Sequence, residues 1–387
     1  MKICNFRPLC WLAFIVILAI ASSMLSIWCL VLVTIGLFLV LWLVKVPPEF
    51  KRVAVIVFIL AVLNYLLTSV VVANPYVRNY DPNAGLRGII LRYVRWYLSM
   101  FLSQDNANLV CAMIFGDKSV LSWTTRSNFT AMGLAHMLAV SGLHVGLVYA
   151  VIGFILRCCR VPKRVHLWII APVLLFYAYL CGWRYAMMRA VIMCLVYAIA
   201  KHRLRVADSL SVLSLAAVVI LLIYPYALVS VSFLLSFTCV LGIYLWYDAI
   251  YKVIPTKAVA MYVAVTLGSL PFVVYFFGAV PLFGIIANVI LVPLLLVAFY
   301  MGMFAVSTFV CGAVLWLVEP LLNFVRWITA AMEKIPWATI HVSHNLLAVL
   351  VYLGASLLLS RFIFIRPKIK YPLVIAMFTC YLVLLVV

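Results

Sequence analysis

The chain has 387 residues, of which 69% are apolar and only 9% are charged. Its mean hydropathy is +1.29, whereas a soluble domain carries roughly 25% charged residues. The composition excludes a soluble globular domain and indicates a polytopic membrane protein. Because each spanning helix needs ~20 apolar residues, the length predicts an all-α helical bundle of roughly ten to thirteen spans.

Basic residues outnumber acidic ones by 28 to 8, which gives a net charge of +20. Basic loops of membrane proteins lie mostly in the cytoplasm. A cytoplasmic N-terminus puts 18 of the 28 on that side, in segments 2–7, 45–52, 157–164, 201–205, 252–257 and 361–370. Topology does not account for the other ten, which are Arg78, Arg87, Arg92, Arg95, Lys118, Arg126, Arg184, Arg189, Arg326 and Lys334.

The first part of the chain is predicted to be an N-terminal transmembrane region over residues 1–80, followed by an amphipathic helix within 81–104. The apolar residues at helical spacing are Leu86, Ile89, Ile90, Tyr93, Trp96, Tyr97 and Met100. Arg92 and Arg95 fall on the other face. This pattern favours a helix in the outer membrane interface. Its arginines either meet lipid phosphates or form an electropositive rim for a polyanion. Residues 105–132 predict a short helix, a loop and a second short helix.

Residues 133–146, GLAHMLAVSGLHVG, are polar for their setting, because they begin an apolar run over 133–156 that is expected to span the membrane. They include His136 and His144, and polar groups at this depth usually face protein or a water-filled cavity. Ser141-Gly142 is a turn signal, so an interrupted helix is expected there. The simpler interpretation is a tightly packed span, in which Gly146 allows a close helix contact. A metal-dependent hydrolase using both histidines would need a sharp break between them.

Arg184 and Arg189 lie at and inside the outer end of another predicted span. An arginine at the centre of a spanning helix costs roughly 2.5–3.5 kcal/mol on insertion scales. Arg184 can reach the surface, whereas Arg189 should face protein, water or a bound anion.

Several later positions are candidates for a cavity wall. Ser232 and Ser236 follow one span, and Asn288 lies in a span near two prolines, Pro281 and Pro293. Irregular backbone in a membrane is tolerated where it is buried or lines a cavity.

The eleven cysteines form no C-x-x-C pair, and His341 and His344 have no nearby carboxylate or thiol. We therefore expect no metal site, no cofactor and no disulfide framework.

Four motifs together resemble the ComEC competence family, the inner-membrane channel proteins of bacterial DNA uptake. They are GLAHMLAVSGLHVG (133–146), RYAMMRAVIM (184–193), SFLLSF (232–237) and FFGAVPLFGIIANVILVP (276–293). The resemblance covers roughly 105–340, which we assign as a ComEC-like membrane domain, followed by a C-terminal transmembrane region over 341–387. The chain departs from the family at Leu234, where a glutamine is frequent.

Longer family members carry an OB-fold domain and a metallo-β-lactamase-like domain. The sequence has no room for the first at 74–84 and no H-x-H-x-D-H motif of the second. We therefore expect a short form that is not an enzyme.

The resemblance implies a channel or permease for single-stranded DNA in the bacterial inner membrane, with membrane lipids around it. Arg87, Arg92, Arg95 and Arg126 would collect the strand, and Arg184 and Arg189 would lower the barrier for phosphates. Without a nucleotide-binding G-x-x-x-x-G-K-[ST] motif, movement would need a cytoplasmic helicase or motor, and a DNA receptor would be a further partner. A homo-oligomer is left open. The alternative is a transporter or flippase for a smaller anionic solute or lipid precursor.

Overall fold

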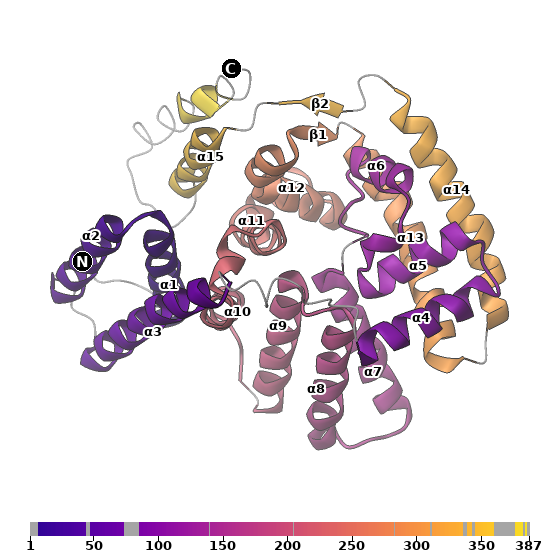
Figure 1. The fold of residues 1–387 in the computed structure, drawn as a ribbon, viewed down its shortest axis with the longest axis horizontal. Coiled ribbons are helices and arrows are strands. Elements are labelled where there is room, and N and C mark those ends of the chain that lie inside the picture. Colours follow the sequence, from indigo (N-terminus) through magenta and orange to yellow (C-terminus); the bar gives the residue numbers. More distant parts are fainter. Residues whose placement is uncertain are drawn as a thin grey trace. The chain divides into compact units, whose positions relative to one another are not determined.

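The fold is seen in a computed structural model, which is almost entirely helical (Figure 1). The residues described are 7–43, 47–72, 85–138, 140–203, 205–281, 283–309, 312–335, 339–342, 345–359, 376–381 and 384. Segment 74–84 and the basic segment 361–370 lie outside them. The chain divides into two compact units, Met1–Ala84 with Gly142–Leu234 and Gly85–Ser141 with Leu235–Val387.

The first unit is a helical bundle in which small residues allow close packing. Its elements are α1 (Pro8–Leu25), α2 (Ile27–Leu43), α3 (Pro48–Val72), α7 (Gly142–Cys158), α8 (Lys163–Leu180), α9 (Tyr185–His202), α10 (Ser209–Ile223), η2 (Pro225–Val229) and the start of α11 (Val231–Val253). Helix α1 packs against α2, α3 and α10, with Val16 and Ala19 fully buried. Asp208 accepts from the Ser211 N–H at 2.9 Å at the start of α10 and pairs with Arg7 at 3.2 Å.

The second unit contains the short helices and the later spans. Its elements are α4 (Leu86–Ser99), α5 (Gln104–Phe115), η1 (Lys118–Val120), α6 (Trp123–Ala131), the rest of α11, α12 (Lys257–Phe277), β1 (Ala279–Pro281), α13 (Gly284–Thr308), η3 (Gly312–Val314), α14 (Leu315–Glu333), β2 (Thr339–His341) and α15 (Leu346–Leu359). The strands β1 and β2 form an antiparallel pair in which Val280 lies opposite Ile340. This pair was not expected in an all-α bundle.

The structure corrects the expected span over 133–156, because its helical part, α7, begins only at Gly142. Gly133 adopts a left-handed φ of +67° after α6. The N–H groups of Gly133 and Leu134 donate to Thr130 O and Phe129 O at 3.0 and 2.7 Å. This pairing is the usual way in which a glycine ends a helix. It stops α6 and leaves the following residues in turns.

Eight helices in the described residues are long and apolar enough to cross a membrane. The protein is therefore a polytopic helical membrane protein, but the expected ten to thirteen spans were too many. Four further apolar helices, including α7, have only 10–17 residues. Seventeen helical residues rise about 26 Å, which is short of a hydrocarbon core of about 30 Å.

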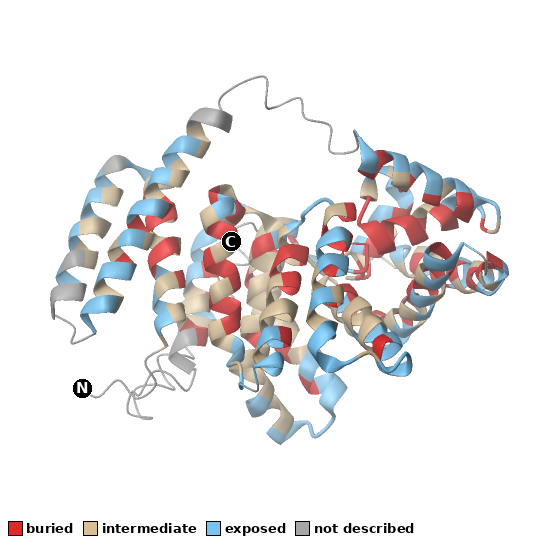
Figure 2. Cartoon of the chain, turned by 90° about the horizontal axis from the view of Figure 1, so that it is seen from below, coloured by how far each residue is buried: buried red, intermediate tan, exposed pale blue. Residues whose placement is uncertain are grey.

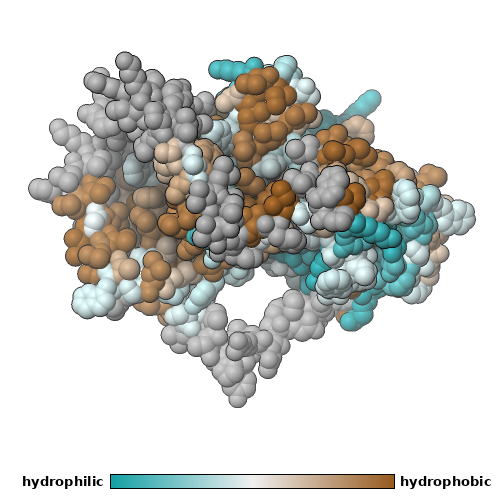
Figure 3. Space-filling model, turned by 90° about the horizontal axis from the view of Figure 1, so that it is seen from above, coloured by the Kyte–Doolittle hydropathy of each residue, from teal (hydrophilic) through white to brown (hydrophobic). Residues whose placement is uncertain are grey.

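The surface matches this class of protein. Exposed and buried residues alternate along the helices (Figure 2), and hydrophobic side chains cover much of the face seen in Figure 3. Trp168 on α8 is 78% exposed and Trp28 on α2 is 75% exposed. Such large exposed apolar groups are suited to lipid rather than water.

Candidate functional site

The most deeply placed of the predicted cationic groups in the first unit is Arg189 on α9. Gly182 and Trp183 adopt left-handed φ values of +74° and +51° in the turn before this helix. The turn leaves Arg184 exposed at the N-cap position and places Arg189 in the second turn of α9. Helix α9 packs against α7, α8 and α10, so Arg189 is only 8% exposed. Its Nη1 lies 3.8 Å from Met193 Sδ, one turn further along.

The Arg189 guanidinium lies against the first residue of α7. A Cβ built on Gly142 would be 2.8 Å from Arg189 Nη2 and 3.8 Å from its Cζ. The structure thus brings together two residues from two of the predicted motifs. The N-terminus of a helix carries a partial positive charge, so both groups favour a negative charge nearby.

The other predicted residues of α7 are differently placed. His144, in the first turn, has no exposed surface. A Cβ on Gly146 would meet nothing within 4 Å, so within the described residues no helix packs closely against Gly146.

The turns that precede α7 belong to the second unit, where they pack against β1 and α13. A Cβ on Gly133 would lie 3.0 Å from Pro281 Cγ and 3.6 Å from Gly284 Cα. Met137 and Val140 are buried, whereas His136 is exposed, with its Nδ1 3.0 Å from Gly133 O. Ser141, the last residue of this stretch, is half-buried. The polar signal in the sequence therefore marks a packed, non-helical segment.

Asn288 lies on α13, one turn after Gly284, the residue that is close to Gly133. Its Nδ2 donates to Gly284 O at 2.6 Å, one turn earlier in α13. Ser236 on α11 is half-buried in the second unit, and Ser232 is exposed in the first.

The four arginines predicted for an electropositive rim differ in their surroundings. Arg92 is exposed, but Arg87 is only 7% exposed. Arg95 Nη2 lies 3.2 Å from Asp117 Oδ2, an ion pair between α4 and the residue before η1. Arg126 is exposed, and its Nη2 donates to Lys118 O.

The predicted apolar face of α4 is mostly exposed, and a different face of the helix is buried. The predicted apolar residues Leu86, Ile89, Tyr93 and Trp96 are exposed, each by more than half. The buried face instead contains Gly88, Leu91, Val94 and Leu98. A helix with one protein-facing side and one exposed apolar side is suited to a membrane interface.

Sequence reasoning missed a polar seam between α5 and α14. Arg326 Nη2 lies 2.6 Å from Asp105 Oδ2, and its Nη1 donates to Asn106 Oδ1 at 3.3 Å. Asn106 in turn donates to Asn323 Oδ1 at 2.7 Å. Glu319 accepts from the Ser103 N–H at 3.1 Å. The signal was available, because Glu319, Asn323 and Arg326 are spaced by four and three residues, which places them on one helix face.

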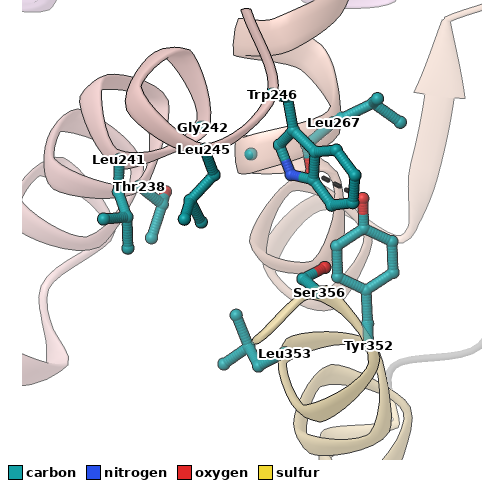
Figure 4. Close-up of a pocket in the computed structure, with 10 residues that line it drawn as sticks. Thr238, Leu241, Gly242, Leu245, Trp246, Leu267, Tyr352, Leu353 and Ser356 are labelled. Atoms are coloured by element: carbon teal, nitrogen blue, oxygen red, sulfur yellow. Dashed lines mark hydrogen bonds between the residues drawn. The ribbon is translucent and has the colours of Figure 1, made fainter. Parts of the chain in front are cut away.

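A small pocket lies between α11, α12 and α15 of the second unit (Figure 4). Gly242 and Gly268 are among the residues that line it, and a Cβ on either glycine would lie 2.6 Å from the Cα of the other. Tyr352 Oη donates to Leu267 O at 2.7 Å. The lining is mostly apolar and contains none of the predicted site residues.

No group of three or more histidine, cysteine or acidic side chains that could hold a metal ion occurs in the described part of the chain. A hydrolase that uses His136 and His144 therefore gains no support from a third ligand.

In the described part of the chain, eight helices are long and apolar enough to cross a membrane, which defines the class of protein as a polytopic membrane protein. Comparison with known sequences then identifies the family. The Competence protein family matches residues 113–367, so the chain belongs to this family. This finding confirms the resemblance inferred from the sequence motifs.

Three relatives illustrate the match. The chain is 26% identical over 208 residues to ComE operon protein 3 of Bacillus subtilis, a match that covers 52% of this chain and 26% of that protein. It is 30% identical over 199 residues to Competence protein ComA of Neisseria gonorrhoeae, with coverages of 49% and 28%. It is 34% identical over 147 residues to Recombination protein 2 of Haemophilus influenzae, with coverages of 36% and 18%.

The matched region is therefore less than a third of the length of each of these three relatives. No solved structure matches the chain.

Proposed function

We propose that the chain is an inner-membrane channel or permease through which single-stranded DNA enters a bacterium during natural transformation. The single observation that carries this proposal is Arg189, a cation 8% exposed within an apolar helical bundle. Ionisable side chains within the helical bundle of a membrane protein often mark the path of an ion or substrate. Membership of the Competence protein family supports DNA as the anion that passes Arg189.

The electropositive residues have separate roles in this account. The exposed Arg92 and Arg126 attract the strand electrostatically, while Arg184, exposed at the N-cap of α9, receives it. Arg87 and Arg95 belong to the same helix, where the pairing of Arg95 with Asp117 holds α4 in place.

We place the N-terminus in the cytoplasm, because that orientation puts most of the basic residues on the cytoplasmic side. The exposed apolar face of α4 lies in an interface of the bacterial inner membrane in this account. In the first unit, α7 and Ser232 are our candidates for residues that line the path. In the second unit, the candidates are the turns before α7, Ser236 and Asn288. A cytoplasmic helicase or motor supplies the energy, and a receptor delivers the DNA.

A second candidate is a transporter or flippase for a smaller anionic solute or lipid precursor. Arg87 is buried and Arg95 is paired with Asp117, which leaves fewer open cations on α4 for a long strand than the sequence predicts. A small anion needs only one buried cation.

Binding by the purified full chain separates the two candidates. A fluorescent single-stranded oligonucleotide is titrated at several salt concentrations, with inorganic phosphate as competitor. DNA conduction predicts an affinity that falls steeply with salt and resists phosphate. An Arg189→Glu variant should bind more weakly, whereas Arg164→Glu, the same charge change at an exposed residue of α8, should not. Displacement by millimolar phosphate, or no binding of the oligonucleotide, would overturn the proposal.

A further inference from the structure

We propose that Gly142 is a positioning residue: the absence of a side chain at the start of α7 creates the space in which the Arg189 guanidinium is held. This inference rests on the proposed function, because it concerns the same cation.

The space at Gly142 is already filled by the arginine. A Cβ built there would be 2.8 Å from Arg189 Nη2, closer than real Cβ atoms approach other heavy atoms, and 3.5 Å from the Cβ of Ala190. The close contact is therefore made by the end of the arginine side chain, while the neighbouring alanine is at an ordinary van der Waals distance.

The backbone does not explain the glycine. Gly142 is not among the residues with positive φ, a group that includes Gly133 and Gly182 on either side in the sequence. An L-residue with a side chain can adopt the conformation found at Gly142, so what glycine provides here is space.

The consequence of adding a methyl group follows from what would have to move. Arg189 is held by the packing of α9 against α7, α8 and α10, but its guanidinium ends a flexible side chain. A new Cβ would displace the guanidinium while leaving the helix positions largely intact. Gly142 thus decides where the positive charge lies, and a substitution there should affect phosphate binding more than stability.

A double-mutant cycle tests this inference. Gly142→Ala, Arg189→Met and the double variant are purified, and the affinity for a short single-stranded oligonucleotide is measured over a range of salt concentrations. Gly153→Ala is the matched control, because it adds the same methyl group to α7 at a position where a Cβ would meet nothing within 4 Å.

We expect Arg189→Met to weaken binding about tenfold or more, since a charge-assisted hydrogen bond is lost. The slope of log K against log salt should fall by about 0.7, the value for one phosphate on a single strand. Gly142→Ala should weaken binding several-fold, and the double variant should bind no more weakly than Arg189→Met alone. Gly153→Ala should match the wild type.

The possible results distinguish a failure of the proposed function from a failure of the inference about Gly142. If Arg189→Met binds like the wild type, the proposed function loses its central observation and the inference falls with it. If Arg189→Met weakens binding while Gly142→Ala does not, or if the two losses add in full, only the inference is overturned.

Should Gly142→Ala fail to fold, the double variant decides the matter. Removing the guanidinium removes the contact, so the double variant is expected to fold. A double variant that is also unfolded would overturn the inference.

Discussion

At the scale of single residues, three arginines in the described part of the chain form ion pairs, and two others, Arg87 and Arg189, are buried. Arg7, Arg95 and Arg326 each lie within 3.2 Å of a carboxylate oxygen. Arg189 lies instead beside Gly142 and Met193. The three ion pairs account for three of the eight acidic residues, and a functional role for Arg189 is our proposal.

Asp117 provides a prediction at this scale. Its side chain is 9% exposed and accepts from both Arg95 and the Ser119 N–H. Asp117→Ala should lower the free energy of unfolding by about 1–3 kcal/mol, because partly buried donors lose their acceptor. Asp105→Ala, at a carboxylate 56% exposed, should cost less than ~1 kcal/mol. Melting temperatures in detergent measure both, and a larger shift for Asp105→Ala would contradict this assignment.

The sequence was sufficient to select the residues of the candidate site as candidates. It was not sufficient to predict which of them contact one another. The sequence marks Gly142 and Arg189 as unusual, because glycine and arginine interrupt apolar runs. It does not show that they meet, since 46 positions separate them and only the packing of α7 on α9 brings them together. The carboxylate that pairs with Arg95 was likewise not foreseen.

At the scale of elements, hydrophobic length located the helices well, while local chemistry decided their ends. The run over 133–156 reads as one span because the apolar residues are continuous. A glycine in the left-handed region at 133 stops α6, however, and α7 starts nine residues later. Hydropathy cannot detect such a stop, because apolar residues in a turn that is buried in protein give the same hydropathy as apolar residues in a spanning helix.

An amphipathic pattern predicts that a helix forms, but it does not predict what each face of the helix contacts. The apolar stripe of α4 was expected, yet most of that stripe is exposed and the opposite side packs on the protein. On α14 the polar face, with Asn323 and Arg326, contacts α5. In a membrane, an apolar face can meet lipid and a polar face can be covered by protein, so the rule for soluble helices is reversed.

The polar seam between α5 and α14 yields a charge-swap prediction. Asp105→Arg and Arg326→Asp should each destabilise the second unit, because like charges then face each other. The double variant should recover part of the loss, with a coupling of about 0.5–1 kcal/mol for a pair this exposed. Thermal unfolding of the three variants measures the coupling. Fully additive losses would show that the 2.6 Å contact contributes nothing to stability.

The crossing of α11 and α12 yields a packing prediction. A Cβ on Gly242 would lie 2.6 Å from Ala264 O and from Gly268 Cα. Both are backbone atoms that cannot move aside, so Gly242→Ala should destabilise the protein by about 1–3 kcal/mol. Gly36→Ala in α2 is the control, because nothing lies within 4 Å of that position. Equal melting temperatures for the two variants would contradict the close crossing.

At the scale of the whole molecule, composition was sufficient to define a polytopic helical membrane protein, and the motifs were sufficient to find its family. The span number was overestimated because several apolar helices are shorter than a bilayer core. Orientation rests on the distribution of basic residues alone, which makes it a quantity to measure.

Cysteine labelling measures this orientation. Cys158, at the end of α7, is exposed, whereas Cys111 in α5 is buried. Burial also raises the pKa of the Cys111 thiol to about 11, so little reactive thiolate forms near neutral pH. In single-cysteine variants, an impermeant maleimide should label Cys158 only after the cells are permeabilised, and Cys111 in neither state. Labelling of Cys158 in intact cells would place the N-terminus outside.

The central claim is that the buried Arg189 serves a strand of DNA crossing the membrane. Its most direct test is the transformation frequency of the source organism after deletion of the gene and reintroduction of the wild type, Arg189→Glu or Arg164→Glu at equal protein levels. The account predicts that the deletion abolishes uptake of added DNA, that the wild type and Arg164→Glu restore it, and that Arg189→Glu does not. Uptake that survives the deletion, a wild-type strain that takes up no DNA, or full restoration by Arg189→Glu would contradict it.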